Sequence, residues 1–324
     1  MQIQQQMKET LEQAQKIAIF GHQSIDGDAI GSMFGLGLQL EKLGKQVSYF
    51  TPDKESQNFD FLPEIQNMQY EFDYADYDVL IFVDFSGYGR IKKFTENHIE
   101  YFDQIPKVII DHHLFDHAFQ NALVYRDESA ISCAELIFEL SKKWRDLIDK
   151  KVATFLYMGI LTDSGNFSYD SGEESIRVMN DAIDLLILGA DKASIILNIF
   201  HRKSLKEVQF SSLILERMQM QDDLIFSRHS QEELELFGVH GDASDTALYT
   251  MVTIEGGELV ILGKEVKDAI KMSFRGKGRY NCRDLCVAFG GGGHHNAAGC
   301  TIPKTGNLEE DIFAFIGEIK EILN

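Results

Sequence analysis

The fold is decided near the N-terminus by Lys16-Ile17-Ala18-Ile19-Phe20-Gly21-His22-Gln23-Ser24-Ile25-Asp26-Gly27-Asp28, an apolar run that ends in a glycine, a histidine and two aspartates. The run Lys16–Gly21 predicts a buried strand. The residues that follow, Ala29–Leu43, predict a helix with its apolar side chains on one broad face, and Gly44 predicts the end of that helix. The polar segment between strand and helix therefore carries ionisable side chains at a strand end.

The same alternation of apolar runs and helical patterns continues through the first half of the chain. Further strands are predicted at Gln46–Phe50, Val79–Asp84 and Val108–Asp111, and further helices at Ala134–Lys143 and Lys151–Leu161. Strands that alternate with helices are typical of βαβ units, so this half predicts an α/β fold with a parallel sheet. Ligands of such sheets bind beyond the carboxyl ends of the strands, where the residues after each run lie.

The second half of the chain has a different pattern. A mostly helical stretch from about Glu174 to Gln219 is interrupted at Gly189, and short strands are predicted from Asp222 onward. These β-like runs lie at Leu224–Ser227, Ala247–Ile254, Leu259–Leu262 and Ala269–Phe274, and a final helix is predicted at Leu308–Leu323. The predicted organisation is a first domain at residues 1–188, a helical connector at 189–221 and a smaller α/β domain at 222–324.

Composition and charge restrict the class of protein. The 324 residues are 44% hydrophobic and 25% charged, which is typical of a globular protein. The formal net charge of −20 disfavours binding of long nucleic acid, although a local positive centre could hold a small anionic ligand. Apolar runs such as Val79–Val83 are too short to span a bilayer and no signal peptide is visible, so we expect a cytoplasmic protein without a membrane partner. The four scattered cysteines are expected to be reduced thiols.

Carboxylates and imidazoles recur where the predicted elements end. The residues concerned are His22, Asp26 and Asp28 after the first strand, Asp84 at the end of another, Asp111-His112-His113 at the end of the next, and Asp163 after an apolar helix. Each aspartate alone has an alternative interpretation, as a helix cap or a turn former. Recurrence at successive junctions of one sheet instead predicts a metal site. Mixed oxygen and imidazole ligands favour manganese or a similar divalent ion over structural zinc.

With these residues the chain resembles the DHH phosphoesterase superfamily, specifically bacterial nanoRNases/pAp phosphatases and stand-alone cyclic-di-AMP phosphodiesterases. His22-x-x-x-Asp26-x-Asp28, Asp84, Asp111-His112-His113 and Asp163 match the family's four motifs in order. The resemblance implies two Mn²⁺ ions, one held by His22, Asp26 and Asp84 and the other by Asp28, Asp84, His112 and Asp163. In this scheme His113 is a catalytic donor to the substrate phosphate, and Asp111 is an acceptor that orients its neighbours.

The C-terminal part resembles the DHH-associated domain of the same enzymes. Its substrate-binding signature is matched by Ser273-Phe274-Arg275 and by Phe289-Gly290-Gly291-Gly292-Gly293-His294-x-x-Ala297-Ala298-Gly299. The resemblance implies substrate contacts for Arg275, Gly291, Gly292, Gly293 and His294, which offer a guanidinium, backbone N–H groups and an imidazole to a phosphate. Gly276 departs from the serine that the family often has there. The alternative interpretation of the four glycines is a hairpin or a flexible linker.

The leading hypothesis is a two-metal phosphoesterase that hydrolyses short oligoribonucleotides, linear dinucleotides such as pApA, and pAp. The alternative enzyme is a cyclic-di-AMP phosphodiesterase. An inorganic pyrophosphatase or exopolyphosphatase would use a similar metal domain, but the segment Gly290–His294 argues against that class. Outside catalysis, a nucleotide-sensing binding protein would keep the fold, and metal-dependent turnover would exclude it. The resemblance also places a homodimer among the expected assemblies.

Overall fold

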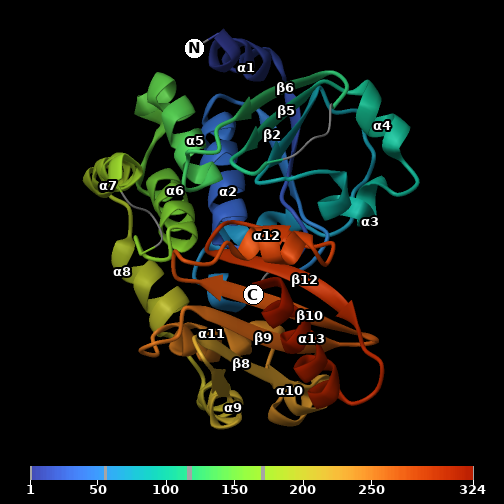
Figure 1. The fold of residues 1–324 in the computed structure, drawn as a ribbon. Coiled ribbons are helices and arrows are strands. Elements are labelled where there is room, and N and C mark those ends of the chain that lie inside the picture. Colours follow the sequence, from blue (N-terminus) through green and yellow to red (C-terminus); the bar gives the residue numbers. More distant parts are fainter. Residues whose placement is uncertain (1, 55–56, 115–118, 169–171, 324) are drawn as a thin grey trace. The chain divides into compact units, whose positions relative to one another are not determined.

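The computed structural model describes residues 2–54, 57–114, 119–168 and 172–323, and it divides into two compact units, residues 1–202 and 203–324 (Figure 1). The division falls inside the segment for which the sequence predicts a helical connector, because that segment packs in two parts. Ile195 in its first part is buried in the core of the first unit. Phe210 and Ile214 in its second part are buried in a core of the second unit.

The first unit is built on a six-stranded parallel sheet, which confirms the predicted α/β fold. Its strands are β1 (Lys16–Phe20), β2 (Gln46–Phe50), β3 (Met68–Gln69), β4 (Val79–Val83), β5 (Lys107–Asp111) and β6 (Ala122–Arg126), in the order β3-β2-β1-β4-β5-β6. The strand order changes direction between β1 and β4. In sheets of this kind the loops after the two strands at that point form the ligand site.

Helices cover both faces of this sheet. They are α1 (Gln2–Gln13), α2 (Gly27–Lys42), α3 (Lys92–Thr95), α4 (Ile99–Gln104), α5 (Cys133–Ser141), α6 (Lys150–Asp163), α7 (Gly172–Ile187) and α8 (Lys192–Ile195), with 3-10 helices at Gln57–Phe59, Pro63–Asn67, Tyr88–Ile91 and Lys142–Leu147 and a π-helix at Ile196–His201. Helices α2, α5 and α6 contact one another and share the core on one face (Figure 1). On the other face an aromatic cluster joins Phe20 and Phe82 to Phe94 of α3 and Phe102 of α4. No helix in the described ranges combines the length and apolarity needed to cross a bilayer.

Helices α2 and α6 approach so closely that a side chain has no room at Gly31. A Cβ atom on this residue would lie 2.5 Å from the carbonyl oxygen of Phe155 and 2.9 Å from the amide nitrogen of Gly159. Both atoms belong to the backbone, so no side-chain rotation would relieve the contact. The close approach brings the first turn of α2 next to α6.

The second unit contains a mixed six-stranded sheet. Its strands are β7 (Gln219–Gln221), β8 (Leu224–His229), β9 (Leu259–Val266), β10 (Ala269–Gly276), β11 (Gly292–Gly293) and β12 (Ala297–Pro303), in the order β11-β12-β10-β9-β8-β7, with only the β8–β9 pair parallel among the described strands. Its helices are α9 (Leu205–Glu216), α10 (Gln231–Phe237), α11 (Asp245–Val252), α12 (Cys282–Val287) and α13 (Leu308–Leu323), and a 3-10 helix spans Gly241–Ser244.

The predicted strand at Ala247–Ile254 is wrong, because this segment forms α11. Its buried residues are Ala247, Leu248 and Met251, which have the spacing of one helix face. Their side chains pack in the same core as Phe210 of α9. Burial of one helical face against α9 and β9 therefore outweighs the local preference of threonine, valine and isoleucine for strands.

Acid is expected to destabilise the second unit through His229 at the end of β8. The ring is buried, its Nδ1 lies 3.2 Å from the Ser230 carbonyl oxygen, and its Nε2 has no hydrogen-bond partner in the described part of the chain. Burial, together with the charges of Lys264 and Arg217, lowers the pKa of His229 from 6.5 to about 4. Between pH 6.5 and pH 4 the histidine is therefore protonated in the unfolded chain but neutral in the folded unit. The free energy of unfolding is highest above pH 6.5 and decreases as the pH falls towards 4.

The variant His229→Phe keeps an aromatic ring against Phe210 and removes the titration. Between pH 7.5 and pH 5, calorimetric unfolding of the wild type should lose roughly 2 kcal/mol more than that of the variant. Equal losses in the two proteins would show that His229 does not cause the acid sensitivity.

Candidate metal centre

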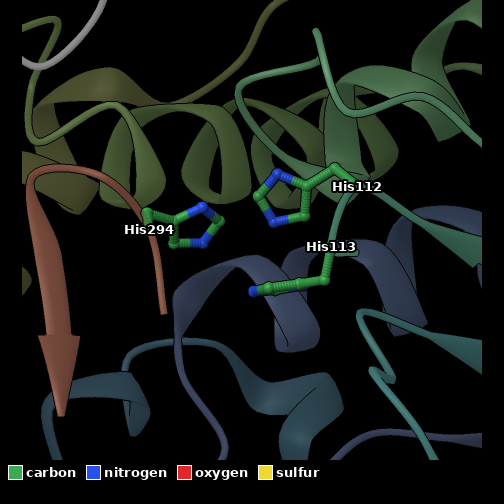
Figure 2. A group of neighbouring side chains, drawn as sticks. All are labelled: His112, His113 and His294. Atoms are coloured by element: carbon green, nitrogen blue, oxygen red, sulfur yellow. The ribbon is translucent and has the colours of Figure 1, made fainter. Parts of the chain in front are cut away.

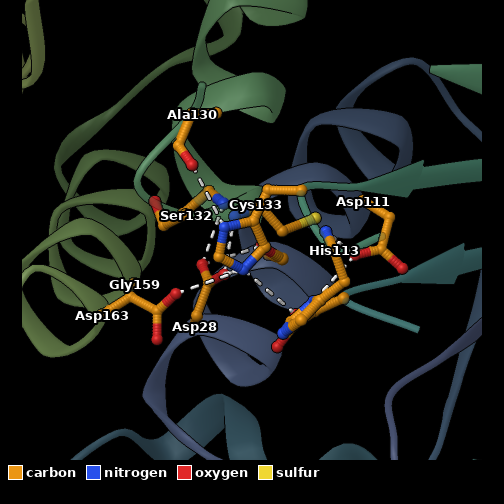
Figure 3. A network of polar contacts seen from close by, with 12 residues as sticks. Asp28, Asp111, His113, Ala130, Ser132, Cys133, Gly159 and Asp163 are labelled. Atoms are coloured by element: carbon orange, nitrogen blue, oxygen red, sulfur yellow. Dashed lines mark hydrogen bonds and ion pairs between the residues drawn. The ribbon is translucent and has the colours of Figure 1, made fainter. Parts of the chain in front are cut away.

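The predicted ligands of the first unit come together at the carboxyl edge of the sheet. The loop after β1 carries His22 and leads into α2, which begins at Gly27 because the Asp26 carboxylate accepts hydrogen bonds from the amides of Asp28 and Ala29. Asp84 follows β4, His112 follows β5, and Asp163 ends α6. Figure 3 shows Asp28 and Asp163 on neighbouring helices, with Asp111 at the end of β5 and His113 just beyond it.

Asp84 lies at the centre of the group. Its Oδ2 is 3.2 Å from Nε2 of His22, which is also 3.5 Å from Oδ2 of Asp26. Its Oδ1 is 3.6 Å from Nε2 of His112. The same His112 nitrogen lies 3.3 Å from Asp163 Oδ2 and 4.0 Å from Asp28 Oδ2. Asp84 thus belongs to two sets of potential ligands that the motifs lead one to expect, His22–Asp26–Asp84 and Asp28–Asp84–His112, and also to a third set with Asp111 and His113.

The two ligand histidines are held by their Nδ1 atoms. Nδ1 of His22 lies 2.8 Å from the carbonyl oxygen of Gln23, and Nδ1 of His112 lies 3.2 Å from that of Ala130. A carbonyl oxygen can only accept, so each Nδ1 carries the proton in this arrangement and donates it. In the neutral form that a metal ligand requires, each Nε2 would then carry the lone pair and face the carboxylates.

Asp28 is fixed by the start of α5. Its carboxylate accepts hydrogen bonds from the amides of Cys133 at 2.6 Å and Ala134 at 2.9 Å, and from the Ser32 hydroxyl at 3.3 Å. Gly159 leaves room for this carboxylate, since a Cβ atom there would lie 2.8 Å from Asp28 Oδ1. This support by α5 was not predicted from the sequence. The pattern Ser132-x-x-Glu135, typical of a helix start, would have located the helix N-terminus.

Asp111 connects the loops after β4 and β5. Its Oδ2 accepts the amides of Phe85 at 2.9 Å and Ser86 at 2.6 Å, whereas its Oδ1 lies 2.9 Å from the amide and 3.0 Å from Nδ1 of His113. Figure 2 shows the imidazoles of His112 and His113, whose ring centroids are 4.4 Å apart and whose planes are inclined by 71°. The arrangement is the one expected of an acceptor that orients its neighbours.

The backbone at Asp84 is strained. The strand predicted to include this residue ends at Val83, because Asp84 adopts a left-handed conformation with φ of 51°. Its Oδ1 is buried and accepts no hydrogen bond from the described residues, although Nδ1 of His113 lies 3.1 Å away. A strained backbone and a carboxylate oxygen without a hydrogen bond, at the point where the ligand sets meet, are typical of a functional site.

The acidic groups of the centre perturb one another. Burial and the nearby carboxylates of Asp84 and Asp163 raise the pKa of Asp28 well above its usual range, and burial raises the pKa of Asp163 to about 7. Burial also disfavours an ionised Asp84, but its contacts with His112, His113 and His22 outweigh this effect and hold its pKa well below normal. Burial opposes protonation of His22, yet Asp26 and Asp84 raise its pKa to about 10. In the protein alone, protonated imidazoles thus balance the carboxylates.

The donor set fits divalent cations. Buried carboxylates and imidazoles that converge on one point require compensating positive charge, and the lone-pair tautomer of both histidines is the ligating one. Oxygen and imidazole donors without thiolate suit Mn²⁺, Mg²⁺ or a similar ion. The thiol of Cys133 does not enter the group, because it donates to the carbonyl oxygen of Ile110 at 3.1 Å.

The predicted substrate-binding residues lie in the second unit. Arg275 on β10 donates from Nη1 to the carbonyl oxygen of Phe274 at 2.8 Å, and its Nε is buried without a hydrogen-bond partner within the described ranges. The adjacent Gly276 has no room for the serine side chain of the family, because a Cβ atom there would lie 2.8 Å from the Tyr280 carbonyl oxygen. These positions remain predicted contacts.

The four glycines form a tight turn and one strand of a hairpin. Gly290 and Gly291 donate their amides to the carbonyl oxygens of Val287 and Cys286 at the end of α12, and β11 pairs with β12. The amide of His294 donates to Ala297. Several N–H groups expected to face a phosphate are therefore already used within the unit. A substrate contact at this loop would rely on groups other than these amides.

A parallel α/β sheet with carboxylates and imidazoles gathered at its carboxyl edge defines a candidate metal-dependent enzyme. Two family models match: the DHH family, N-terminal domain over residues 16–160, and the DHHA1 domain over residues 233–324. The chain therefore carries a DHH domain followed by a DHHA1 domain, and the resemblance found in the sequence is confirmed.

Relatives with these domains are similar over most of the chain. A protein of Mycoplasma genitalium named bifunctional oligoribonuclease and PAP phosphatase NrnA is 26% identical over 93% of this chain and 92% of its own length. The cyclic-di-AMP phosphodiesterase PdeA of Listeria monocytogenes is 28% identical over 91% of this chain, which spans only 46% of that protein. The crystal structure of an exopolyphosphatase-related protein from Bacteroides fragilis superposes with a TM-score of 0.87, at 26% identity, over 99% of this chain and 96% of its own. The names of the Mycoplasma genitalium and Listeria monocytogenes relatives are those of enzymes that act on phosphate esters, which supports an enzyme.

Proposed function

We propose that this protein is a manganese-dependent phosphoesterase that hydrolyses short oligoribonucleotides and linear dinucleotides such as pApA, and also removes phosphate from pAp. The observation that carries the proposal is the group around Asp84, in which His22, Asp28, Asp84 and His112 are buried and Asp26 and Asp163 lie within 3.5 Å of their imidazoles. The full-length similarity to an oligoribonuclease and PAP phosphatase supports this substrate class.

Two Mn²⁺ ions are the proposed cofactors. His22, Asp26 and Asp84 would hold one ion, and Asp28, Asp84, His112 and Asp163 the other, with Asp84 shared. When bound, such a pair supplies a water of lowered pKa as the nucleophile and positive charge opposite the phosphoryl oxygens. Backbone groups of the protein keep these ligands in place: the α5 amides hold Asp28, and carbonyl oxygens hold His22 and His112.

His113 is proposed to donate a hydrogen bond or a proton to the reacting phosphate. Burial lowers the proton affinity of its ring, but Asp111 and Asp84 outweigh this effect and raise the pKa of His113 to about 9. An imidazole that stays protonated at neutral pH is a suitable donor to an anion. Asp111 would keep the ring oriented, and Arg275, Gly291, Gly292, Gly293 and His294 of the second unit would contact the rest of the nucleotide.

Cyclic-di-AMP is the second candidate substrate. The specific observation in its favour is the similarity to the Listeria monocytogenes phosphodiesterase over 91% of this chain. This chain spans only 46% of that relative but 92% of the Mycoplasma genitalium oligoribonuclease and PAP phosphatase. Similarity therefore supports cyclic-di-AMP as a substrate less strongly than short oligoribonucleotides and pAp.

The test is hydrolysis of a substrate panel by the purified protein with Mn²⁺. The panel contains pApA, a 5′-phosphorylated pentaribonucleotide, pAp, cyclic-di-AMP and pyrophosphate. We expect release of mononucleotide from pApA and the pentamer and of phosphate from pAp, and no activity after chelation of the metal. Cleavage of cyclic-di-AMP alone would favour the second candidate. Nucleotide binding without any turnover would contradict an enzyme and favour a binding protein.

A further inference from the structure

Arg90 lies next to the loop that carries His22, and it is not among the predicted site residues. It belongs to the 3-10 helix Tyr88–Ile91, which begins four residues after Asp84. Its carbonyl oxygen accepts the amide of Gln23 at 2.8 Å, so its backbone is bound to the loop that carries His22. The helix that contains Arg90 thus connects the loops after β1 and β4, the two loops at which the strand order of the sheet changes direction.

The guanidinium of Arg90 has no counter-ion in the described part of the chain. Its Nε is buried without a hydrogen-bond partner, and no described carboxylate lies within 4.0 Å of it. By contrast, Arg177 and Arg217, on α7 and after α9, are paired with Glu135 and Glu233. Burying an arginine nitrogen without a partner is unfavourable, and this acidic chain has 51 aspartates and glutamates that could have supplied one.

We propose that Arg90 binds a phosphate group of the nucleotide substrate. The planar guanidinium presents parallel N–H donors that match two phosphate oxygens, and a half-buried position strengthens such a contact. The same short helix buries the Tyr88 hydroxyl without a partner among the described residues, so this turn carries two unsatisfied polar groups. An anion that reaches the metal centre would satisfy the arginine, for which the described part of the chain supplies no carboxylate. This assignment rests on the proposed phosphoesterase function.

The test compares two variants, Arg90→Gln and Arg90→Lys, with the control Arg145→Gln. The control removes an exposed arginine and changes the net charge by the same amount as Arg90→Gln. The first readout is binding of 5′-AMP to the Mn²⁺-loaded protein by calorimetry, and the second is the kinetics of pApA hydrolysis. Arg90→Gln should weaken AMP binding and raise KM for pApA about 10- to 100-fold. Arg90→Lys should recover part of the loss because it keeps the charge without the planar donors. Manganese affinity and the melting temperature should stay at wild-type values.

The outcomes separate this assignment from the proposed function. Unchanged AMP binding in Arg90→Gln, or an equal loss in Arg145→Gln, overturns the role of Arg90 even when the wild type hydrolyses pApA. A loss of manganese affinity or of thermal stability in Arg90→Gln would reveal a structural role and also overturns it. A wild type that binds AMP through Arg90 but leaves pApA intact would support the phosphate contact and reject the phosphoesterase function. A wild type that neither binds AMP nor hydrolyses pApA overturns both.

Discussion

Replacement of Asp84 by asparagine is expected to lower kcat/KM for pApA roughly a thousand-fold. The carboxylate belongs to both ligand sets of the metal centre, and its two oxygens face the imidazoles of His22, His112 and His113. Asparagine keeps the volume and tolerates the left-handed backbone at this position. The variant therefore removes the charge with little disturbance of the loop. Bound manganese per chain, measured on the same samples, should fall in parallel.

The matched control is Asp222→Asn. Asp222 also has a left-handed backbone, with φ of 58°, but its side chain is 88% exposed and lies in the second unit. This change should leave turnover and manganese content at wild-type values. Retention of more than about a tenth of the activity in Asp84→Asn would argue that the two ligand sets are not both needed for hydrolysis.

Substitution of Gly31 by alanine should destabilise the first unit by about 2–3 kcal/mol. Alanine has the higher helix propensity, but its Cβ atom would meet the backbone of Phe155 and Gly159 at 2.5–2.9 Å, so α2 and α6 would have to move apart. Calorimetry would measure the change, and fluorescence of Trp144, the single tryptophan of the chain, would report the first unit.

Gly317→Ala provides the opposite case within the same protein. Gly317 lies in α13, and a Cβ atom there would meet no other atom within 4 Å. The substitution should therefore stabilise the second unit by roughly 0.5–1 kcal/mol, because alanine restricts the unfolded chain more than glycine does. If Gly31→Ala stabilised its unit as Gly317→Ala does, helix propensity would outweigh the close contact between α2 and α6.

The elements that the sequence predicts correctly are those whose pattern is strong by itself. The apolar runs at Val79–Val83 and Val108–Asp111 are buried on both faces in the structure, so their composition alone identifies them as strands. The segment Ala247–Ile254 is different, because its residues are compatible with a strand or a helix. Its packing against α9 determines that it forms a helix. The place where the chain divides into two units likewise depends on long-range packing, which no local pattern records.

The sequence predicts which side chains take part in the candidate site. It does not predict how they are arranged in space. Aspartates and histidines at strand ends are visible in the sequence, and the fold brings them to one edge of the sheet. Other features depend on tertiary contacts. They are the left-handed backbone of Asp84, the amides of Cys133 and Ala134 that hold Asp28, and the buried Nε of Arg90, which has no hydrogen-bond partner among the described residues. For the glycine run Gly290–Gly293, the sequence motif predicts amides that contact a ligand. In the structure, the amides of Gly290 and Gly291 instead form hydrogen bonds within the second unit.

The ligand loops around Asp84 come from both ends of the first unit, between His22 and Asp163. A cation bound by all of them would stabilise the folded unit as a reversible cross-link does, because its binding free energy would be released only when these distant segments meet. Scarcity of that cation in a cell would then do more than slow turnover. It would shift part of the population towards open forms that proteases recognise, so the supply of the metal would help to set the abundance of the protein.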